Sequence, residues 1–199
     1  MKSNSWKLKD ILMIAVCAVL FGVIFLGATY AGGFLAGVLT PAGMSSLGYE
    51  PFYGLYFMAV AFAVYVIRKP GAGIVAEILA AIIETLMGNF FGPIIILSGF
   101  VQGFGFELIF MLTRYKKFDR KTFILASIIC SCVTMVYNLI VSGYNLIALP
   151  VLALMLAVRI ISAIAIDAFA TPLLSDSLAK AGVLRGYAIC DSVNSNLED

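Results

Sequence analysis

The chain has 199 residues, of which 62% are hydrophobic and only 12% charged, with a net charge of +2. Soluble domains carry about 25% charged residues, so this composition predicts an integral membrane protein. A membrane-crossing helix needs about 20 residues, so six such helices would occupy nearly the whole chain, which we treat as one membrane domain over residues 1–199. The length therefore leaves no room for a soluble catalytic domain.

The hydrophobic stretches predict an all-α, polytopic protein with six transmembrane helices. In chain order we expect them at residues 11–30, 51–67, 72–87, 94–113, 122–142 and 146–170. The glycine-rich residues 31–49 are expected to form an external connection that can dip back into the membrane. A short amphipathic stretch, residues 178–184, is expected on the cytoplasmic surface after the last helix.

The basic residues predict how the chain is oriented in the membrane. They occupy alternate gaps between the predicted helices: Lys2, Lys7 and Lys9, then Arg68 and Lys69, then Arg114, Lys116, Lys117, Arg120 and Lys121, and finally Lys180 and Arg185. Cytoplasmic loops are enriched in Lys and Arg, so both termini are expected in the cytoplasm of a multi-pass plasma-membrane protein. The basic residues are sorted by topology and form no patch for nucleic acid.

The sequence lacks the motifs of common enzyme classes. It contains no histidine, which excludes zinc sites with His ligands and His general bases. It also lacks a P-loop, a G-x-S-x-G motif and an acidic prenyl-transfer cluster. We therefore expect no catalytic residue, metal or cofactor, and the remaining class is a carrier or a substrate-binding membrane subunit.

Five charged residues lie inside the predicted helices: Glu77, Glu84, Glu107, Arg159 and Asp167. Charges in such positions normally face the bundle interior, a cavity or a partner, because exposure to lipid is costly. Arg159 is the only base among them, and it is expected to form a structural ion pair. Glu77 and Glu107 are both plausible mates by their depth in the membrane.

Glu84 is expected near the external surface without a basic partner. The polar and aromatic residues predicted around its level are Tyr49, Glu50, Tyr53, Asn89, Gln102, Tyr137, Asn138 and Tyr144. A carboxylate surrounded by aromatic rings can bind an organic cation through charge pairing and cation–π attraction, so this set is the predicted substrate site. The alternative is a protonated Glu84 within the bundle and a belt of interfacial tyrosines.

Small residues mark places where helices can approach closely. Ala15, Ala18 and Gly22 form a stripe on the first predicted helix, which could face another subunit. Gly99 and Gly103 form a G-x-x-x-G pair on the fourth, for which internal packing is expected.

Several short runs, spread over nearly the full chain, carry a resemblance to a known family. They are Tyr49-Glu50-Pro51-Phe52-Tyr53-Gly54, Ile67-Arg68-Lys69-Pro70-Gly71-Ala72, Gly88-Asn89, Gly92-Pro93, Gln102-Gly103-Phe104-Gly105, Val141-Ser142-Gly143-Tyr144 and Ser175-Asp176-Ser177-Leu178-Ala179. Together they resemble the YkoE-type S components of energy-coupling factor (ECF) transporters, a family assigned to thiamine or its hydroxymethylpyrimidine precursor.

The resemblance implies a substrate-binding subunit that works with a membrane coupling protein (the T component) and ATP-binding cassette subunits. It also implies that the coupling protein contacts an A-x-x-x-A motif on the first helix, for which the nearest match is Ala18-x-x-x-Gly22. The alternative is a self-sufficient proton- or cation-coupled carrier of an organic cation, in which Glu77, Glu84 and Glu107 form a proton path.

Overall fold

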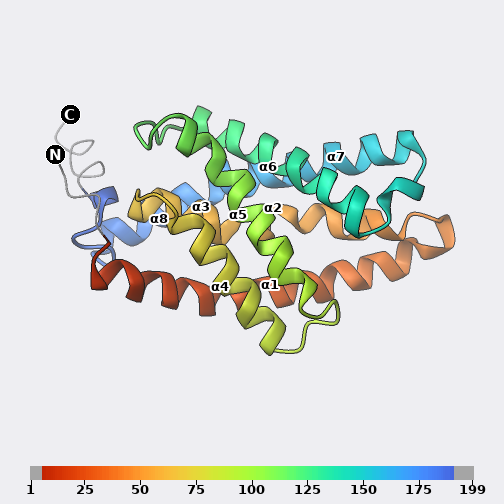
Figure 1. The fold of residues 1–199 in the computed structure, drawn as a ribbon, viewed down its shortest axis with the longest axis horizontal. Helices are drawn as coiled ribbons and strands as arrows, with labels where there is room; N and C mark the ends of the chain where they lie inside the picture. Colours follow the sequence, from red (N-terminus) through yellow and green to blue (C-terminus); the bar gives the residue numbers. More distant parts are fainter. Residues whose placement is uncertain (1–5, 191–199) are drawn as a thin grey trace.

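The computed structural model describes residues 6–190, in which helices are joined by turns and loops and no strand occurs (Figure 1). The elements are α1 (Leu8–Leu39), η1 (Thr40–Ala42), η2 (Ser45–Phe52), α2 (Tyr53–Tyr56), α3 (Met58–Ile67), α4 (Ala72–Leu86), α5 (Ile94–Leu112), α6 (Arg120–Val141), η3 (Tyr144–Leu146), α7 (Leu149–Ala163), η4 (Ile164–Ala170) and α8 (Thr171–Lys180). The prediction of an all-α membrane protein is confirmed. The two terminal segments, whose side of the membrane was predicted, lie outside the described residues.

Five helical segments are long and apolar enough to cross a membrane. They are Leu8–Ala42, Ser45–Ile67, Ile94–Leu112, Arg120–Val141 and Leu149–Lys180. The remaining predicted span corresponds to α4, which has only 15 residues. At about 1.5 Å per residue it is shorter than the hydrocarbon core of a bilayer, about 30 Å thick. The number six therefore stays a prediction.

The glycine-rich segment after the first predicted span differs from its prediction. Helix α1 continues to Leu39, and the chain then returns through η2 along the same helix. The glycines allow this close approach: a Cβ on Gly32 would lie 2.6 Å from the Tyr49 ring, and one on Gly48 would collide with the backbone of Ala36. Residues 31–39, expected in an external connection, are therefore part of α1, and Gly32 and Gly48 serve tight packing between two helical segments.

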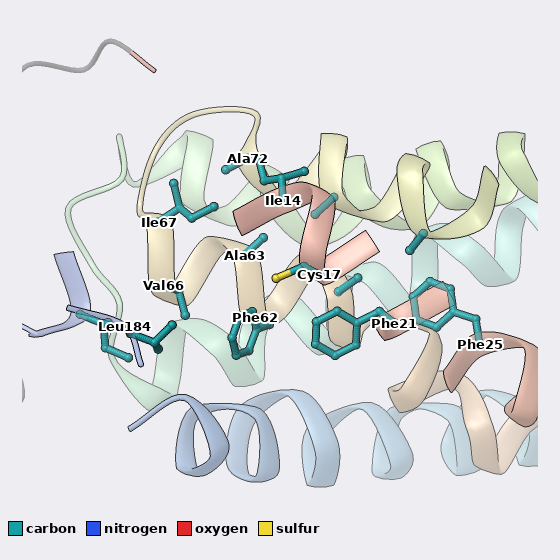
Figure 2. Packing of buried hydrophobic residues seen from close by; sticks show 14 residues of the cluster. Ile14, Cys17, Phe21, Phe25, Phe62, Ala63, Val66, Ile67, Ala72 and Leu184 are labelled. Carbon is teal, nitrogen blue, oxygen red and sulfur yellow. The ribbon is translucent and has the colours of Figure 1, made fainter. Parts of the chain in front are cut away.

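Helix α3 lies at the centre of the bundle, and this position explains why its sequence is almost uniformly apolar. Ala59, Val60, Ala63 and Val66 are fully buried, and α3 contacts α1, α4, α5 and α8. Figure 2 shows the cluster that α1 contributes, in which Phe21 packs against Phe62 with ring centroids 5.5 Å apart.

The start of α1 and the segment after α8 lie at the same end of the bundle (Figure 1). Tyr187 donates a hydrogen bond to the carbonyl oxygen of Lys9 at 2.6 Å. Lys69, in the α3–α4 turn, forms an ion pair with Asp10 at 2.6 Å, and Trp6 lies beside Gly71 in the same turn. These contacts tie the first residues of α1 to the end of the bundle that carries most basic loops.

Candidate functional site: an aromatic cavity with a buried carboxylate

A cavity of about 510 Å³ opens at the other end of the bundle, between α1, η2, α2, α4, α5, α6 and η3. Most of the residues predicted to bind a substrate line it: Tyr49, Tyr53, Glu84, Gln102, Tyr137, Asn138 and Tyr144. The volume falls within the range of about 300–1,000 Å³ that is typical of small-molecule sites. Residues from seven separate elements are thus brought together around one space, although whether they bind a ligand stays a prediction.

Glu84 carries the charged group of this cavity, near the end of α4. Its Oε1 accepts a hydrogen bond from the Thr29 hydroxyl at 2.8 Å and another from the Asn89 side-chain amide. Thr29 is in turn 3.0 Å from the Tyr56 hydroxyl. These donors fix the orientation of the carboxyl group, and Oε2 has no hydrogen-bond partner among residues 6–190. Asn89 does not line the cavity itself, so its contact with the cavity runs through Glu84.

Aromatic rings form much of the wall around Glu84. Tyr53 packs against Tyr56 with ring centroids 5.7 Å apart, and Tyr49 packs edge-to-face on Phe91 at 5.4 Å. Rings held by such contacts present rigid faces to a planar ligand. Tyr144 stands in the loop between α6 and α7, where burial raises the pKa of its phenol, so the hydroxyl stays neutral.

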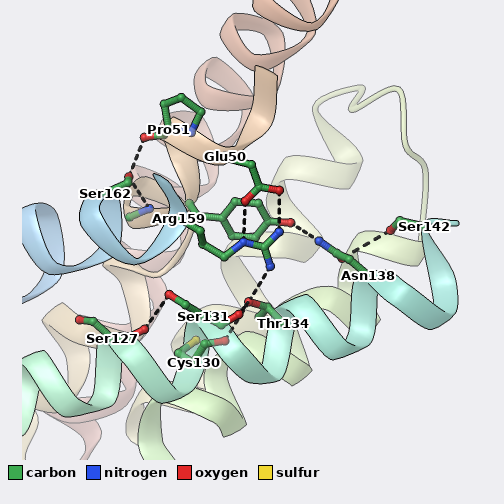
Figure 3. Close-up of polar contacts among 12 residues, drawn as sticks. Glu50, Pro51, Ser127, Cys130, Ser131, Thr134, Asn138, Ser142, Arg159 and Ser162 are labelled. Carbon is green, nitrogen blue, oxygen red and sulfur yellow. Dashed lines mark hydrogen bonds and ion pairs between the residues drawn. The ribbon is translucent and has the colours of Figure 1, made fainter. Parts of the chain in front are cut away.

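The prediction for Arg159 is wrong about its partner. Arg159 donates to both carboxylate oxygens of Glu50, from Nε at 2.7 Å and from Nη2 at 2.8 Å (Figure 3). Its Nη1 donates to Thr134 at 3.1 Å, and its guanidinium lies 3.6 Å from the centre of the Tyr53 ring. Glu50 is fully buried in this pair and does not line the cavity, so its predicted place at the substrate is also wrong.

The ion pair nevertheless supports the cavity wall from behind. It holds one face of Tyr53, while Asn138 donates from Nδ2 to the Tyr53 hydroxyl at 2.5 Å. Tyr53 and Asn138 both line the cavity, so a buried charge network sets the position of two of its polar groups.

The two acids expected to pair with Arg159 accept backbone hydrogen bonds instead. Glu107 accepts from the N–H groups of Gly71 at 2.6 Å and Ile74 at 2.8 Å, at the start of α4, and from the Tyr115 hydroxyl at 2.6 Å. Burial raises the pKa of Tyr115, which therefore serves as a neutral donor. Glu77 accepts from the N–H of Val60 at 2.9 Å, in the first turn of α3. Each carboxylate thus complements the positive end of a neighbouring helix.

The prediction that the small stripe on α1 faces another subunit is wrong for two of its three members. Ala18 is buried, and Gly22 packs so closely on α4 that an added Cβ would lie 2.8 Å from Ile83. Ala15 alone is exposed. The Gly99 and Gly103 pair packs against α4 inside the bundle, which confirms its prediction.

Sequence reasoning missed several residues that line the cavity, among them Phe25, Thr29, Tyr56 and Phe91. A signal existed for Tyr56, which follows Tyr53 by three residues and so shares its helical face. No comparable signal existed for Thr29, because a single threonine near the end of the helix expected at residues 11–30 has neither a charge nor a ring to mark it as a cavity residue. The described residues contain no group of three or more His, Cys, Asp or Glu that could hold a metal ion.

Comparison with known proteins agrees with this architecture. Residues 9–133 match the family model described as the permease component of an ABC-type cobalt transport system. The chain is 41% identical, over 94% of its length and 91% of the relative, to YkoE of Bacillus subtilis (strain 168), a protein named as an HMP/thiamine permease. A solved structure described as an S component of an ECF transporter superposes with a TM-score of 0.91 at 39% identity, covering 98% of this chain and 96% of the other.

These relatives are membrane transport proteins, and the present chain is a multi-pass protein of the plasma membrane with no enzymatic role. The chain belongs to the YkoE-type family of ECF-transporter S components.

Proposed function

We propose that this protein captures thiamine or its hydroxymethylpyrimidine precursor outside the cell and delivers it for ATP-driven uptake. The observation that carries the proposal is the cavity wall described above, in which Glu84 stands among tyrosines and side-chain amides. Thiamine combines a permanently charged thiazolium ring with a planar aminopyrimidine. A carboxylate suits its charged or amino groups, and rigid aromatic rings suit its two planar systems.

The proposed roles of the lining residues follow from their chemistry. Glu84 supplies the charge, and Asn89 orients it. Tyr49, Tyr53, Tyr137 and Tyr144 supply ring faces and hydroxyl groups, while Gln102 and Asn138 supply amides that can both donate and accept. Glu50 and Arg159 act behind the wall and do not touch the ligand.

The proposal requires the cavity to face the outside. With α4 as a short third crossing, the chain crosses six times as one membrane domain, both termini lie in the cytoplasm, and the basic loops lie at the opposite end from the cavity. Labelling of single cysteines in whole cells tests this orientation. A cysteine at Ser142 should react with a membrane-impermeant thiol reagent, whereas one at Lys117 should not, in a background without the native cysteines. Both positions are exposed in the structure.

The proposed partners are a membrane coupling protein and ATP-binding cassette subunits, since the chain has no P-loop of its own. Uptake of labelled thiamine into cells should stop when the ATPase subunits are deleted. Uptake that persists without them and collapses with the proton gradient would instead identify a self-sufficient carrier.

Calorimetric titration of the purified protein with thiamine and with hydroxymethylpyrimidine tests the binding function directly. We expect saturable binding of one or both at a single site. If neither ligand binds to folded protein, the proposed substrate class is wrong, whatever the outcome of the uptake experiment.

A further inference from the structure

A second buried acidic group lies away from the cavity and takes no part in the proposed ligand site. Asp167 is fully buried in η4, a π-helical segment that links α7 to α8. Neither of its carboxyl oxygens has a hydrogen-bond partner in the described part of the chain. Irregular π-helical turns are frequent at functional sites, because they place side chains where a regular helix would not.

Two other buried side-chain oxygens, on Glu77 and Thr171, also have no hydrogen-bond partner among the described residues. Glu77, which interacts electrostatically with Asp167, uses Oε2 for the Val60 N–H but leaves Oε1 without a donor. Thr171, one turn along the helix from Asp167, is fully buried with an unpartnered hydroxyl. These four atoms are the only buried side-chain oxygens or nitrogens without a partner in residues 6–190.

Every other acid buried in the described bundle is satisfied in a different way. Glu50 has Arg159, Glu107 has backbone N–H groups and Tyr115, and Glu84 has Thr29 and Asn89. The guanidinium of Arg159 is already used by Glu50, Thr134 and the Tyr53 ring. The thiol of Cys130 also lies in the electrostatic field of Asp167 and Glu77, and it supplies no positive charge.

Two negative carboxylates cannot both stay charged in such a place. An ionised group that is buried without a partner loses its hydration and gains nothing in return, and a second negative charge nearby raises the cost further. A proton removes both penalties, because it neutralises one carboxyl and gives it a donor for a neighbouring oxygen.

We propose that Asp167 is an intramembrane proton-binding site, occupied at neutral pH, with Glu77 as its negatively charged neighbour. The assignment between the two follows from their donors. Glu77 has a backbone N–H and the positive end of α3 to stabilise its charge, whereas Asp167 has no donor at all. A protonated Asp167 carries no charge, so its burial without a partner costs less than the burial of a carboxylate would.

Infrared spectroscopy of the purified full chain in lipid nanodiscs tests the proposal without any ligand. At neutral pH the wild type should show the C=O band of a protonated carboxyl group, shifted when H2O is exchanged for D2O. Asp167→Asn should lose this band. Glu77→Gln should keep it but shift its frequency, because the neighbouring charge is gone. Glu107→Gln is the matched control and should leave the band unchanged, because the N–H groups of Gly71 and Ile74 and the Tyr115 hydroxyl all donate to Glu107 and favour its charged form.

Two results would overturn the proposal. One is a wild-type spectrum at neutral pH that has no protonated carboxyl band, or whose band keeps its frequency in Glu77→Gln. Neither measurement requires the Asp167→Asn variant, so the test does not depend on whether that variant folds. The other is a wild-type melting temperature that is higher in sodium chloride than in choline chloride, together with an Asp167→Asn variant that melts at the same temperature in both salts. That outcome would replace the proton with a sodium ion.

Discussion

At Glu84 the charge of the side chain can be separated from its hydrogen bonds. Thr29 and Asn89 both donate to Oε1, so a glutamine at this position can keep these contacts through its own carbonyl oxygen while it loses the negative charge. The substitution is therefore a specific probe of charge in the cavity.

We predict that Glu84→Gln weakens thiamine binding by about 1–3 kcal/mol, the range of a charge-assisted hydrogen bond, and leaves the fold intact. Calorimetry with the purified variant measures the change, and its melting temperature serves as the control for folding. Wild-type affinity in a well-folded variant would exclude Glu84 as the binding carboxylate.

Arg159 is expected to act on stability. Removal of one partner from a buried ion pair typically costs about 3–5 kcal/mol, because the other charge is left without compensation. Arg159→Ala should therefore lower the melting temperature in detergent more than Glu84→Gln does. Combined with Glu50→Gln, which removes the unpaired charge, it should cost less than the sum of the two single variants. The double variant of Arg159→Ala with Glu77→Gln is the control, and its loss of stability should equal the sum of the two single losses. The pairing with Glu50 would be contradicted if the losses were additive with Glu50→Gln and non-additive with Glu77→Gln.

Single residues were predicted well where the argument used depth in the membrane and chemical type. Tyr53, Gln102 and Asn138 could be gathered around Glu84 in this way, although they come from different helices. The partner of Arg159 was not predicted, because Glu50, which lies in a 3-10 segment, was assigned to the substrate site at the level of Glu84. The roles of Glu77 and Glu107 were hidden for another reason, since their partners are backbone N–H groups, which every residue except proline carries.

Among the helices, α3 and α4 depend at their first turns on carboxylates from other helices. The first N–H groups of a helix have no partner within it, and water is scarce in a membrane interior. Glu77 of α4 serves the start of α3, and Glu107 of α5 serves the start of α4. The three helices are therefore linked in succession by side chain to backbone bonds.

We predict that Glu107→Ala lowers the free energy of unfolding by about 2–4 kcal/mol, since it leaves the partly buried N–H groups of Gly71 and Ile74 without an acceptor. Hydrogen exchange should accelerate at Gly71 and Ile74, the two amides that Glu107 accepts from. Tyr115→Phe removes a single donor to the same carboxylate and is expected to have a smaller effect. Unchanged exchange at both amides in Glu107→Ala would show that Glu107 does not stabilise the start of α4.

Two glycines of α1 allow a matched test of how closely this helix packs. A Cβ at Gly22 would meet Ile83 at 2.8 Å and the Ala80 backbone oxygen at 3.0 Å, whereas one at Gly27 would meet nothing within 4 Å. Gly22→Ala should therefore destabilise the protein by about 1–3 kcal/mol through overpacking. Gly27→Ala should be neutral or slightly stabilising, because alanine favours the helix. Equal melting temperatures for the two variants would argue against the close contact between α1 and α4.

For the whole molecule, the exposed face of α1 replaces the buried stripe as the expected contact with a coupling protein. Ala15 is the one member of that stripe that remains accessible. We predict that Ala15→Trp leaves the affinity of the isolated protein for thiamine near wild type but lowers transport by the assembled complex, because bulk is added where close approach is needed. Ile140→Trp, at an exposed position on α6, is the control and should change neither quantity. Wild-type transport by Ala15→Trp would remove this face from consideration.

The position of the chain's only tryptophan has a practical consequence for how ligand binding can be observed. Trp6 lies beside Gly71, at the end of the bundle opposite the cavity, and the cavity wall contains tyrosine and phenylalanine as its only aromatic residues. Emission excited selectively from tryptophan should therefore stay constant when the cavity fills. Tyrosine absorbance should respond instead, and the silent indole becomes a built-in reference signal against which that response can be normalised.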